Sequence, residues 1–193
     1  MITLVSMSRR TDMYLSFVEQ IEKLMGKLVT NYYVFVNDPQ TLPFYKSLEL
    51  KLPKIKVFNA PGDFVCRYGH DTVYNYLEKQ VQTPYILKLF DTDTIEVDPK
   101  LLEEELKLDL DVYGMETYME RGDVWETKYQ LYKKGVFEWF GLVHENQHWK
   151  IGNPTSGVLK SLKVYHHNAI DPESAKLDKT PDGFIILKKT QEG

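Results

Sequence analysis

The sequence predicts a single α/β domain with a mostly parallel central sheet, flanked by helices, and a smaller β-rich C-terminal half. Apolar strand segments alternate with amphipathic helical segments through the first half of the chain. These strands are apolar along almost their whole length, which is typical of parallel strands covered on both faces. A chain of 193 residues is long enough to bury one sizeable core, which favours a single domain over two.

The composition excludes several classes of protein. Hydrophobic residues make up 42% and charged residues 27%, as in ordinary globular domains. The net charge of −4, with both signs interspersed, gives no reason to expect a nucleic-acid partner. Cys66 is the single cysteine, so an intrachain disulfide and a Cys-rich metal cluster are excluded. No apolar run approaches the roughly 18–20 residues of a transmembrane helix, and the opening segment predicts no signal peptide. We therefore expect a cytoplasmic protein without a transmembrane segment.

The first half is predicted to alternate strand and helix. Strands are expected at residues 2–5, 32–36, 55–58 and 85–90. Helical spacing of apolar residues predicts a helix capped by Asp12, a short helix over 42–50, and a helix that starts at Asp71 or Thr72. Asp98 is expected to cap a further helix that has Pro99 at its first position.

The second half is predicted to be richer in strands. Residues 112–118 and 124–132 flank a turn-like Glu-Arg-Gly-Asp segment and predict a hairpin. Further strand segments are expected at 137–143 and 162–165. The chain is thus expected to form one domain, with a nucleotide-binding half at 1–98, a catalytic half at 99–170 and a tail at 171–193.

Asp91 and Asp93 are the strongest candidates for chemistry. They follow directly after the apolar segment YILKLF, and ligands of open α/β sheets bind at the carboxyl ends of strands. Two carboxylates on one turn can share a divalent cation, and Mg²⁺ or Mn²⁺ so held can bind a diphosphate. A second Asp-x-Asp, at Asp109 and Asp111, follows an acidic helix and is interpreted as a solvated loop. The alternative for Asp91 and Asp93 is that they only cap the turn.

Polar segments follow the other predicted strands of the first half, at 6–10, 37–38 and 63–67. A parallel sheet brings such strand ends to one edge. Ser6, Arg9, Arg10 and Arg67 are therefore candidates to contact phosphate, and Asp38 to accept a hydrogen bond from a base or ribose. Each of them is equally compatible with an ordinary loop residue.

Histidines form two further patterns in the second half. The segment HENQH (144–148) matches His-Glu-x-x-His, which in zinc proteases places two histidines on one helix face. The β-branched and aromatic residues before it favour a strand or loop, so a chance match is the preferred interpretation. His166 and His167 end a predicted strand, and one of them, with His167 preferred, is a candidate imidazole ligand for the metal. Two surface histidines are the alternative.

The chain resembles, over residues 1–168, the GT-A (Rossmann-like) nucleotide-sugar-dependent glycosyltransferases, most of all the family-2 type. The segments that carry the resemblance are ITLVSMSRR, YYVFVNDP, RYGHDTVYNYLEKQVQTPYILKLFDTD and FEWFGLVHE. It implies that Asp91 and Asp93 bind Mn²⁺ or Mg²⁺ and the donor diphosphate, and that Asp38 lies near the base. It also implies that Glu145 activates the acceptor and that a C-terminal histidine completes the metal site.

The sequence departs from the family in three ways. It is short, it lacks the Pro-x-Tyr-Asn pattern in the first loop, and His144-Glu145 replaces the usual Glu-Asp pair. The expected function is a metal-dependent, inverting hexosyltransferase-like enzyme that moves a sugar from a nucleoside-diphosphate sugar to an unidentified glycan, protein or lipid-linked acceptor. The alternatives are a nucleotidyltransferase, a zinc metalloprotease and a non-catalytic nucleotide- or sugar-binding module.

Overall fold

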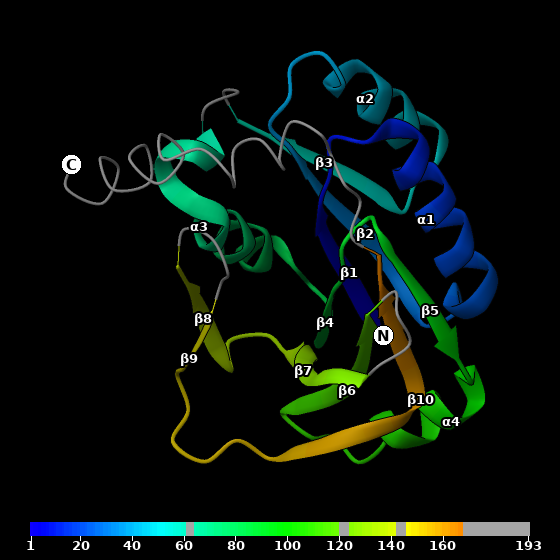
Figure 1. Ribbon diagram of the computed structural model, residues 1–193, viewed down its shortest axis with the longest axis vertical. Helices are drawn as coiled ribbons and strands as arrows, with labels where there is room; N and C mark the ends of the chain where they lie inside the picture. The colour runs from blue at the N-terminus through cyan, green and yellow to red at the C-terminus, as the bar shows by residue number, and fades with distance from the viewer. Residues whose placement is uncertain (61–63, 120–123, 142–145, 168–193) are drawn as a thin grey trace.

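The computed structural model describes residues 1–60, 64–119, 124–141 and 146–167 (Figure 1). They form a mixed α/β fold with a large, curled and mostly parallel sheet flanked by helices, which confirms the predicted fold class. The helices are α1 (Thr11–Met25), α2 (Leu42–Lys51), α3 (Phe64–Gln80) and α4 (Pro99–Leu106). The strands are β1 (Ile2–Met7), β2 (Val29–Val36), β3 (Ile55–Asn59), β4 (Tyr85–Lys88), β5 (Asp93–Val97), β6 (Val112–Met119), β7 (Val124–Lys133), β8 (Phe137–Phe140), β9 (Asn146–Trp149) and β10 (Ser156–His166).

Within the described residues, the main sheet has the strand order β3-β2-β1-β4-β7-β6-β10-β5. The first half of the chain supplies its parallel part, because β1 pairs in parallel with β2 and β4, and β2 pairs in parallel with β3. The predicted hairpin is confirmed as antiparallel β6 and β7, and β7 joins the two parts by pairing antiparallel to β4. Strands from both halves of the chain therefore build one continuous sheet.

Each face of the sheet has its own hydrophobic core. One core packs α1 and α2 against β1, β2 and β4, and the other packs α3 and β8 against the opposite face. Figure 1 shows α1 and α2 on one side of the sheet and α3 on the other. Residues of β4 alternate between the two cores: Tyr85 and Leu87 join the first, whereas Ile86 lies in the second. Coverage of both faces explains why these strands are apolar throughout.

One helix start differs from the sequence prediction. The Asp12 cap is wrong, since Arg10 occupies the N-cap position and Asp12 lies within the first turn of α1. Element α3 consists of two helices joined across a kink at Gly69, whose φ of +83° favours glycine. The second of them begins just after Gly69, close to the start predicted at Asp71 or Thr72, and the helix from Phe64 to the kink was not predicted. The Asp98 cap is confirmed, because its carboxylate accepts hydrogen bonds from the backbone N–H groups of Lys100 and Leu101.

The segment after β4 also differs from the prediction. The expected strand over 85–90 ends at Lys88, and a separate strand, β5, starts at Asp93 and pairs antiparallel with β10. The turn is tight, because the backbone N–H of Asp93 donates to the carbonyl of Phe90. Asp91 and Thr92 therefore lie in a short, buried connection between two strands. Among the described helices, none has the length and hydropathy needed to cross a membrane.

Candidate active site

The candidate site lies where β1 and β4 end. Strand β1 continues to Met7, two residues beyond its predicted end, and this moves the following loop. Ser6 consequently lies inside the strand and is fully buried, whereas Ser8 is the serine that reaches Asp91. Arg9 is exposed, and Arg10 is the arginine that contacts Asp91. Of the candidates in segment 6–10, Arg10 therefore lies against Asp91, whereas the extra length of β1 places Ser8, and not Ser6, next to this carboxylate.

Both carboxylate oxygens of Asp91 accept hydrogen bonds. Ser8 Oγ donates to Oδ2 over 2.6 Å, and Arg10 Nη1 lies 3.3 Å from Oδ1. Since the single hydroxyl proton of Ser8 goes to Asp91, the Tyr45 hydroxyl, 2.6 Å away, must donate to Ser8 Oγ. A chain of hydrogen bonds thus runs from α2 through the β1 loop to Asp91 and fixes the orientation of its carboxylate.

The electrostatics of Asp91 reflect opposing influences. Burial raises the pKa of its carboxyl, the hydrogen bond from Ser8 and the Arg10 charge lower it, and the neighbouring Asp93 charge raises it again; the net direction is upward. Burial also raises the pKa of Tyr45 to about 12, so that its hydroxyl remains a donor. Asp91 is therefore a buried carboxylate beside a second acidic group, a typical environment for a functional site.

Asp93 is even less accessible, with 1% of its side chain exposed. Its Oδ2 accepts a hydrogen bond from the backbone N–H of Phe90, and its Oδ1 lies 2.7 Å from Nδ1 of His166. The next histidine, His167, instead lies 2.9 Å from Thr94 Oγ1 through its Nε2. The two histidines differ in partner, as strand alternation predicts. The sequence favoured His167 as the metal ligand; in the structure His167 lines the cleft beside the aspartates, whereas His166 contacts Asp93 itself.

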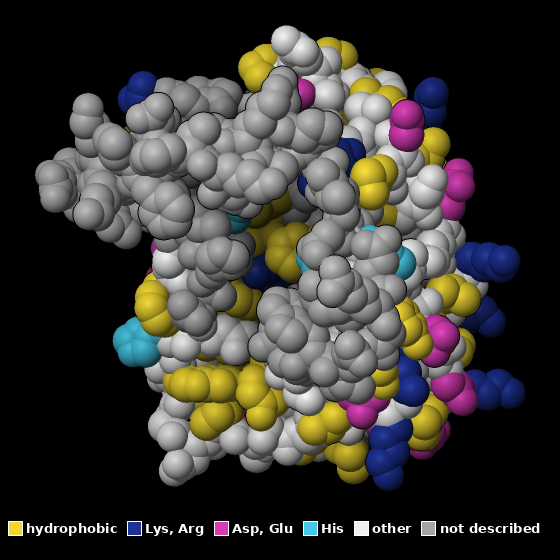
Figure 2. All heavy atoms as spheres, viewed as in Figure 1, with side chains coloured by type: hydrophobic (Ala, Val, Ile, Leu, Met, Phe, Trp, Pro, Cys, Tyr) yellow, Lys and Arg dark blue, Asp and Glu magenta, His cyan; other side chains and the backbone are white. Residues whose placement is uncertain are grey.

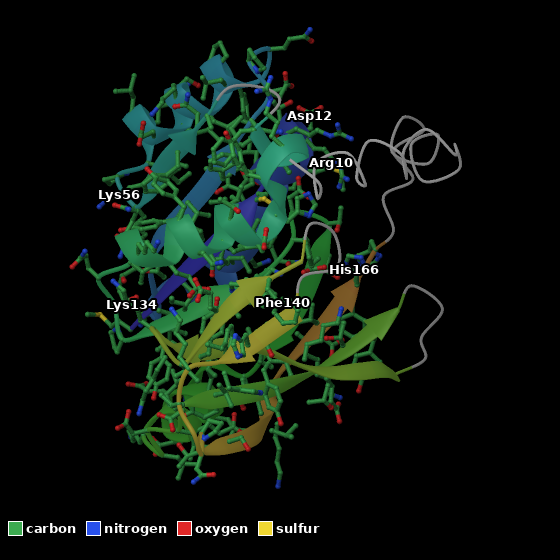
Figure 3. The ribbon with its side chains drawn as sticks, turned by 90° about the vertical axis from the view of Figure 1, so that its left-hand side faces the viewer. Arg10, Asp12, Lys56, Lys134, Phe140 and His166 are labelled. Carbon is green, nitrogen blue, oxygen red and sulfur yellow. The ribbon has the colours of Figure 1, made fainter. Side chains whose placement is uncertain are left out.

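A cleft of about 380 Å³ opens beside the two aspartates. Helix α1 and the turn after β4 form its walls, and His167 lies at its edge. Figure 3 shows Arg10 and Asp12 at the start of α1 on the same side of the molecule as His166 at the end of β10. The residues that line the cleft are Asp12, Met13, Ser16, Phe17, Gln20, Asp91, Thr92, Asp93, Thr94 and His167.

A second cleft, of about 390 Å³, lies at the ends of β2 and β3 and includes Asp38. Asp38 is half-buried, and its Oδ1 accepts a hydrogen bond from the backbone N–H of Gln40. Arg67 is exposed in the first turn of α3. Figure 2 shows a hollow in this face of the molecule, in the region where Figure 1 places α3 and β1, with hydrophobic and basic side chains within it.

The donor groups of the site suit a hard divalent cation, because Asp91 and Asp93 offer carboxylate oxygens and His166 offers an imidazole beside them. Among the described residues, however, no three His, Cys, Asp or Glu side chains are arranged as a complete metal site. A cation bound to the two aspartates would need further oxygen ligands. Mg²⁺ commonly takes such ligands from substrate phosphates and water.

The His-Glu-x-x-His interpretation fails on the part of the motif that the structure describes. Residues Asn146–Trp149 form β9, which pairs antiparallel with β8, and His148 is exposed on it. The motif therefore does not continue along a helix, as the zinc-protease arrangement requires. His144 and the candidate base Glu145 lie outside the described residues.

Compared by sequence, the chain matches no family model and no curated protein. Compared by structure, it is similar to S. aureus TarS, a GT-A-type glycosyltransferase. The structure of TarS residues 1–349 matches with a TM-score of 0.60 and 12% identity over 86% of this chain. Its complex with UDP-GlcNAc gives 0.61 and 12% over 86%, and its complex with UDP gives 0.60 and 11% over 98%.

This similarity shows the glycosyltransferase fold. The chain spans 60% of the TarS 1–349 chain and 38% of the longer TarS chain that it matches, in the latter case with a TM-score of 0.59.

Proposed function

We propose that the protein is a glycosyltransferase that takes a sugar from a nucleoside-diphosphate sugar and transfers it to an acceptor. The observation that carries the proposal is the pair Asp91 and Asp93, buried at the carboxyl end of β4 in a sheet with the fold of TarS. That TarS structures hold UDP and UDP-GlcNAc makes a uridine donor the first candidate.

The donor would lie across the ends of the parallel strands. The cleft with Asp38 is proposed to take the base and ribose, because Asp38 has a second carboxylate oxygen beyond its bond to Gln40. Asp91 and Asp93 are proposed to hold Mn²⁺ or Mg²⁺ against the diphosphate. When bound, the cation would neutralise charge on the leaving nucleoside diphosphate. Ser8 and Tyr45 would keep the Asp91 carboxylate in place through their hydrogen bonds.

Glu145 remains the proposed general base, on the ground of the family resemblance. It would take the proton from the acceptor hydroxyl as that oxygen attacks the anomeric carbon, with inversion. Glu145→Gln should leave donor affinity unchanged while turnover falls by about 10²–10⁴, the usual contribution of a general base. Unchanged turnover would remove Glu145 from the mechanism.

A thermal-shift screen tests the proposal. Nucleoside diphosphates and nucleotide sugars, with and without Mn²⁺, are added to the protein, and unfolding temperatures are compared. A ligand present at 100 times its Kd adds about 2.7 kcal/mol to the free energy of unfolding, which is readily detected. We expect a uridine diphosphate to stabilise the protein, and more so with Mn²⁺. No stabilisation by any nucleotide would contradict the proposal.

A further inference from the structure

Arg10 lies where its guanidinium could bind either of two partners, the Asp91 carboxylate or a phosphate group of a ligand. Its guanidinium lies against Asp91, and 30% of the side chain is exposed, compared with 8% of the Asp91 side chain. A positive charge thus occupies the position at which a divalent cation would meet this carboxylate. The guanidinium is the more exposed partner of this pair.

The contact between Arg10 and Asp91 is a weak one for its kind. Its length of 3.3 Å exceeds the roughly 2.7–2.9 Å of a good charge-assisted hydrogen bond. It is also the one hydrogen bond that the guanidinium makes with the part of the chain that is described. A guanidinium has five N–H donors in a planar fork, which matches a phosphate as well as a carboxylate. Most of these donors have no hydrogen-bond partner among the residues that the structure describes.

Ser8 holds the Asp91 carboxylate independently of Arg10. The serine hydroxyl donates to Oδ2 over 2.6 Å, and the Tyr45 hydroxyl is hydrogen-bonded to the serine. Neither hydrogen bond involves Oδ1, the oxygen that Arg10 contacts. Asp91 would therefore keep its orientation if the guanidinium left. The backbone of Arg10 is fixed independently, because its N–H donates to Ser8 Oγ and its carbonyl accepts from Tyr14. The side chain can turn without disturbing the start of α1.

We propose that Arg10 exchanges partners when substrate binds. In the nucleotide-free protein it neutralises Asp91; when a divalent cation and a nucleoside diphosphate bind, the cation takes the carboxylate and the guanidinium turns to the diphosphate. The inference rests on the proposed function, since it requires that Asp91 meets the cation. It adds that Arg10 competes with the cation for Asp91 and binds the diphosphate of the nucleotide. Removal of the side chain should therefore raise the affinity for the cation and lower the affinity for the nucleotide.

The test compares the wild-type protein with Arg10→Ala and Arg10→Lys. Mn²⁺ affinity of the nucleotide-free protein is measured by the loss of the free-ion EPR signal, and UDP affinity is measured by calorimetry at saturating Mn²⁺. Lys56→Ala is the control, because it removes the same charge from an exposed position on the opposite side of the molecule (Figure 3). We expect Arg10→Ala to bind Mn²⁺ several-fold more tightly and UDP about tenfold or more weakly, as loss of a hydrogen bond to a charged group predicts. Arg10→Lys should lie between, and Lys56→Ala should match the wild type.

Each other outcome overturns the exchange. Weaker or unchanged Mn²⁺ binding in Arg10→Ala would mean that the guanidinium supports Asp91 rather than competing for it. Unchanged UDP affinity would mean that the guanidinium does not reach the diphosphate. If the wild-type protein binds no nucleoside diphosphate, the proposed function itself fails. If the wild-type protein binds UDP and Arg10→Ala binds it equally well, only the exchange fails.

Discussion

Asp91 and Asp93 share a turn, yet they contact different parts of the chain. Asp91 contacts Ser8 and Arg10 from the first half of the chain, whereas Asp93 contacts His166 from the last strand. The second Asp-x-Asp is more exposed: 77% of the Asp109 side chain is exposed, and Asp109 pairs with Lys133. The two Asp-x-Asp segments therefore differ in burial and in partners, although their sequence pattern is the same.

This contrast predicts the effect of two alanine substitutions. Asp93→Ala should lower UDP affinity in the presence of Mn²⁺ by at least about tenfold, because it removes a charged group that would hold the cation. Asp109→Ala should leave this affinity unchanged. Calorimetric titration of both variants with UDP and Mn²⁺ is the measurement, and equal losses in the two variants would contradict the assignment.

The two histidines can be separated in the same way. His166→Ala should weaken Mn²⁺ binding in the presence of UDP several-fold, since its imidazole lies against Asp93, whereas His167→Ala should not, since its partner is Thr94. Mn²⁺ affinity is read by EPR with UDP present. A loss confined to His167→Ala would restore the preference drawn from the sequence. No loss in either variant would leave the metal to the aspartates, phosphate and water.

Among the elements, helix α3 connects the two-stranded sheet of β8 and β9, here called the β8–β9 ribbon, to the main sheet. Three polar residues on one face of the helix make this connection through hydrogen bonds. Asp71 accepts a hydrogen bond from the backbone N–H of Gly141, and Asn75 exchanges two hydrogen bonds with the backbone of Trp139. Glu78 accepts hydrogen bonds from the indole of Trp139 and the hydroxyl of Tyr132. The ribbon is thus held by side chains rather than by a strand ladder.

Buried Glu78 should be important for stability. Glu78→Ala leaves the Tyr132 hydroxyl without its acceptor in the core, while the Trp139 indole keeps the Tyr132 oxygen as an acceptor; the loss should cost about 1–3 kcal/mol of unfolding free energy. Glu78→Gln keeps a carbonyl oxygen as acceptor, so it should cost less. Urea unfolding followed by circular dichroism measures both. Equal losses would mean that the carboxylate charge, rather than the hydrogen bonds, matters here.

The ionisation of Glu78 should make the stability of the protein depend on pH. Burial raises the pKa of its carboxyl, while the hydrogen bonds from Tyr132 and Trp139 and the Lys88 charge lower it, with a net upward direction. The folded state therefore keeps this proton to a higher pH than the unfolded chain, whose glutamate pKa is about 4.3. Above that value the stability of the wild type should fall relative to Glu78→Gln as pH rises. A constant difference between the two proteins from pH 4 to pH 8 would contradict the raised pKa.

The structure also shows what could be predicted from the sequence and what could not. The strand-helix alternation, the β6–β7 hairpin and the Asp98 cap depend on local patterns, and they were predicted correctly. The end of β1 and the start of β5 depend on pairing with distant strands, which local patterns do not contain. The choice of Ser6 over Ser8 follows from that same uncertainty, since Ser6 lies within the strand when β1 continues to Met7.

At the scale of the whole molecule, the sheet joins the two halves of the site. Strand β10 returns between β6 and β5, and this brings His166 to Asp93 although 73 residues separate them in the sequence. The ring of Phe90 connects this pair to the opposite core, since it lies 5.6 Å from the His166 ring and 5.4 Å from the Lys88 ammonium. Lys88 itself is buried over the rings of Tyr74 and Trp139. The candidate site is therefore supported by both cores of the sheet.

If the site at this sheet edge cleaves a nucleoside-diphosphate sugar, the protein should release the nucleoside diphosphate. This prediction is tested most directly by incubating the protein with UDP-GlcNAc and Mn²⁺, with and without a mixture of glycan acceptors, and quantifying UDP and pyrophosphate. We predict that UDP is released, that no pyrophosphate forms, and that Asp93→Ala abolishes the release. Pyrophosphate as the product would indicate nucleotidyl transfer, and UDP release that persists in Asp93→Ala would contradict the account.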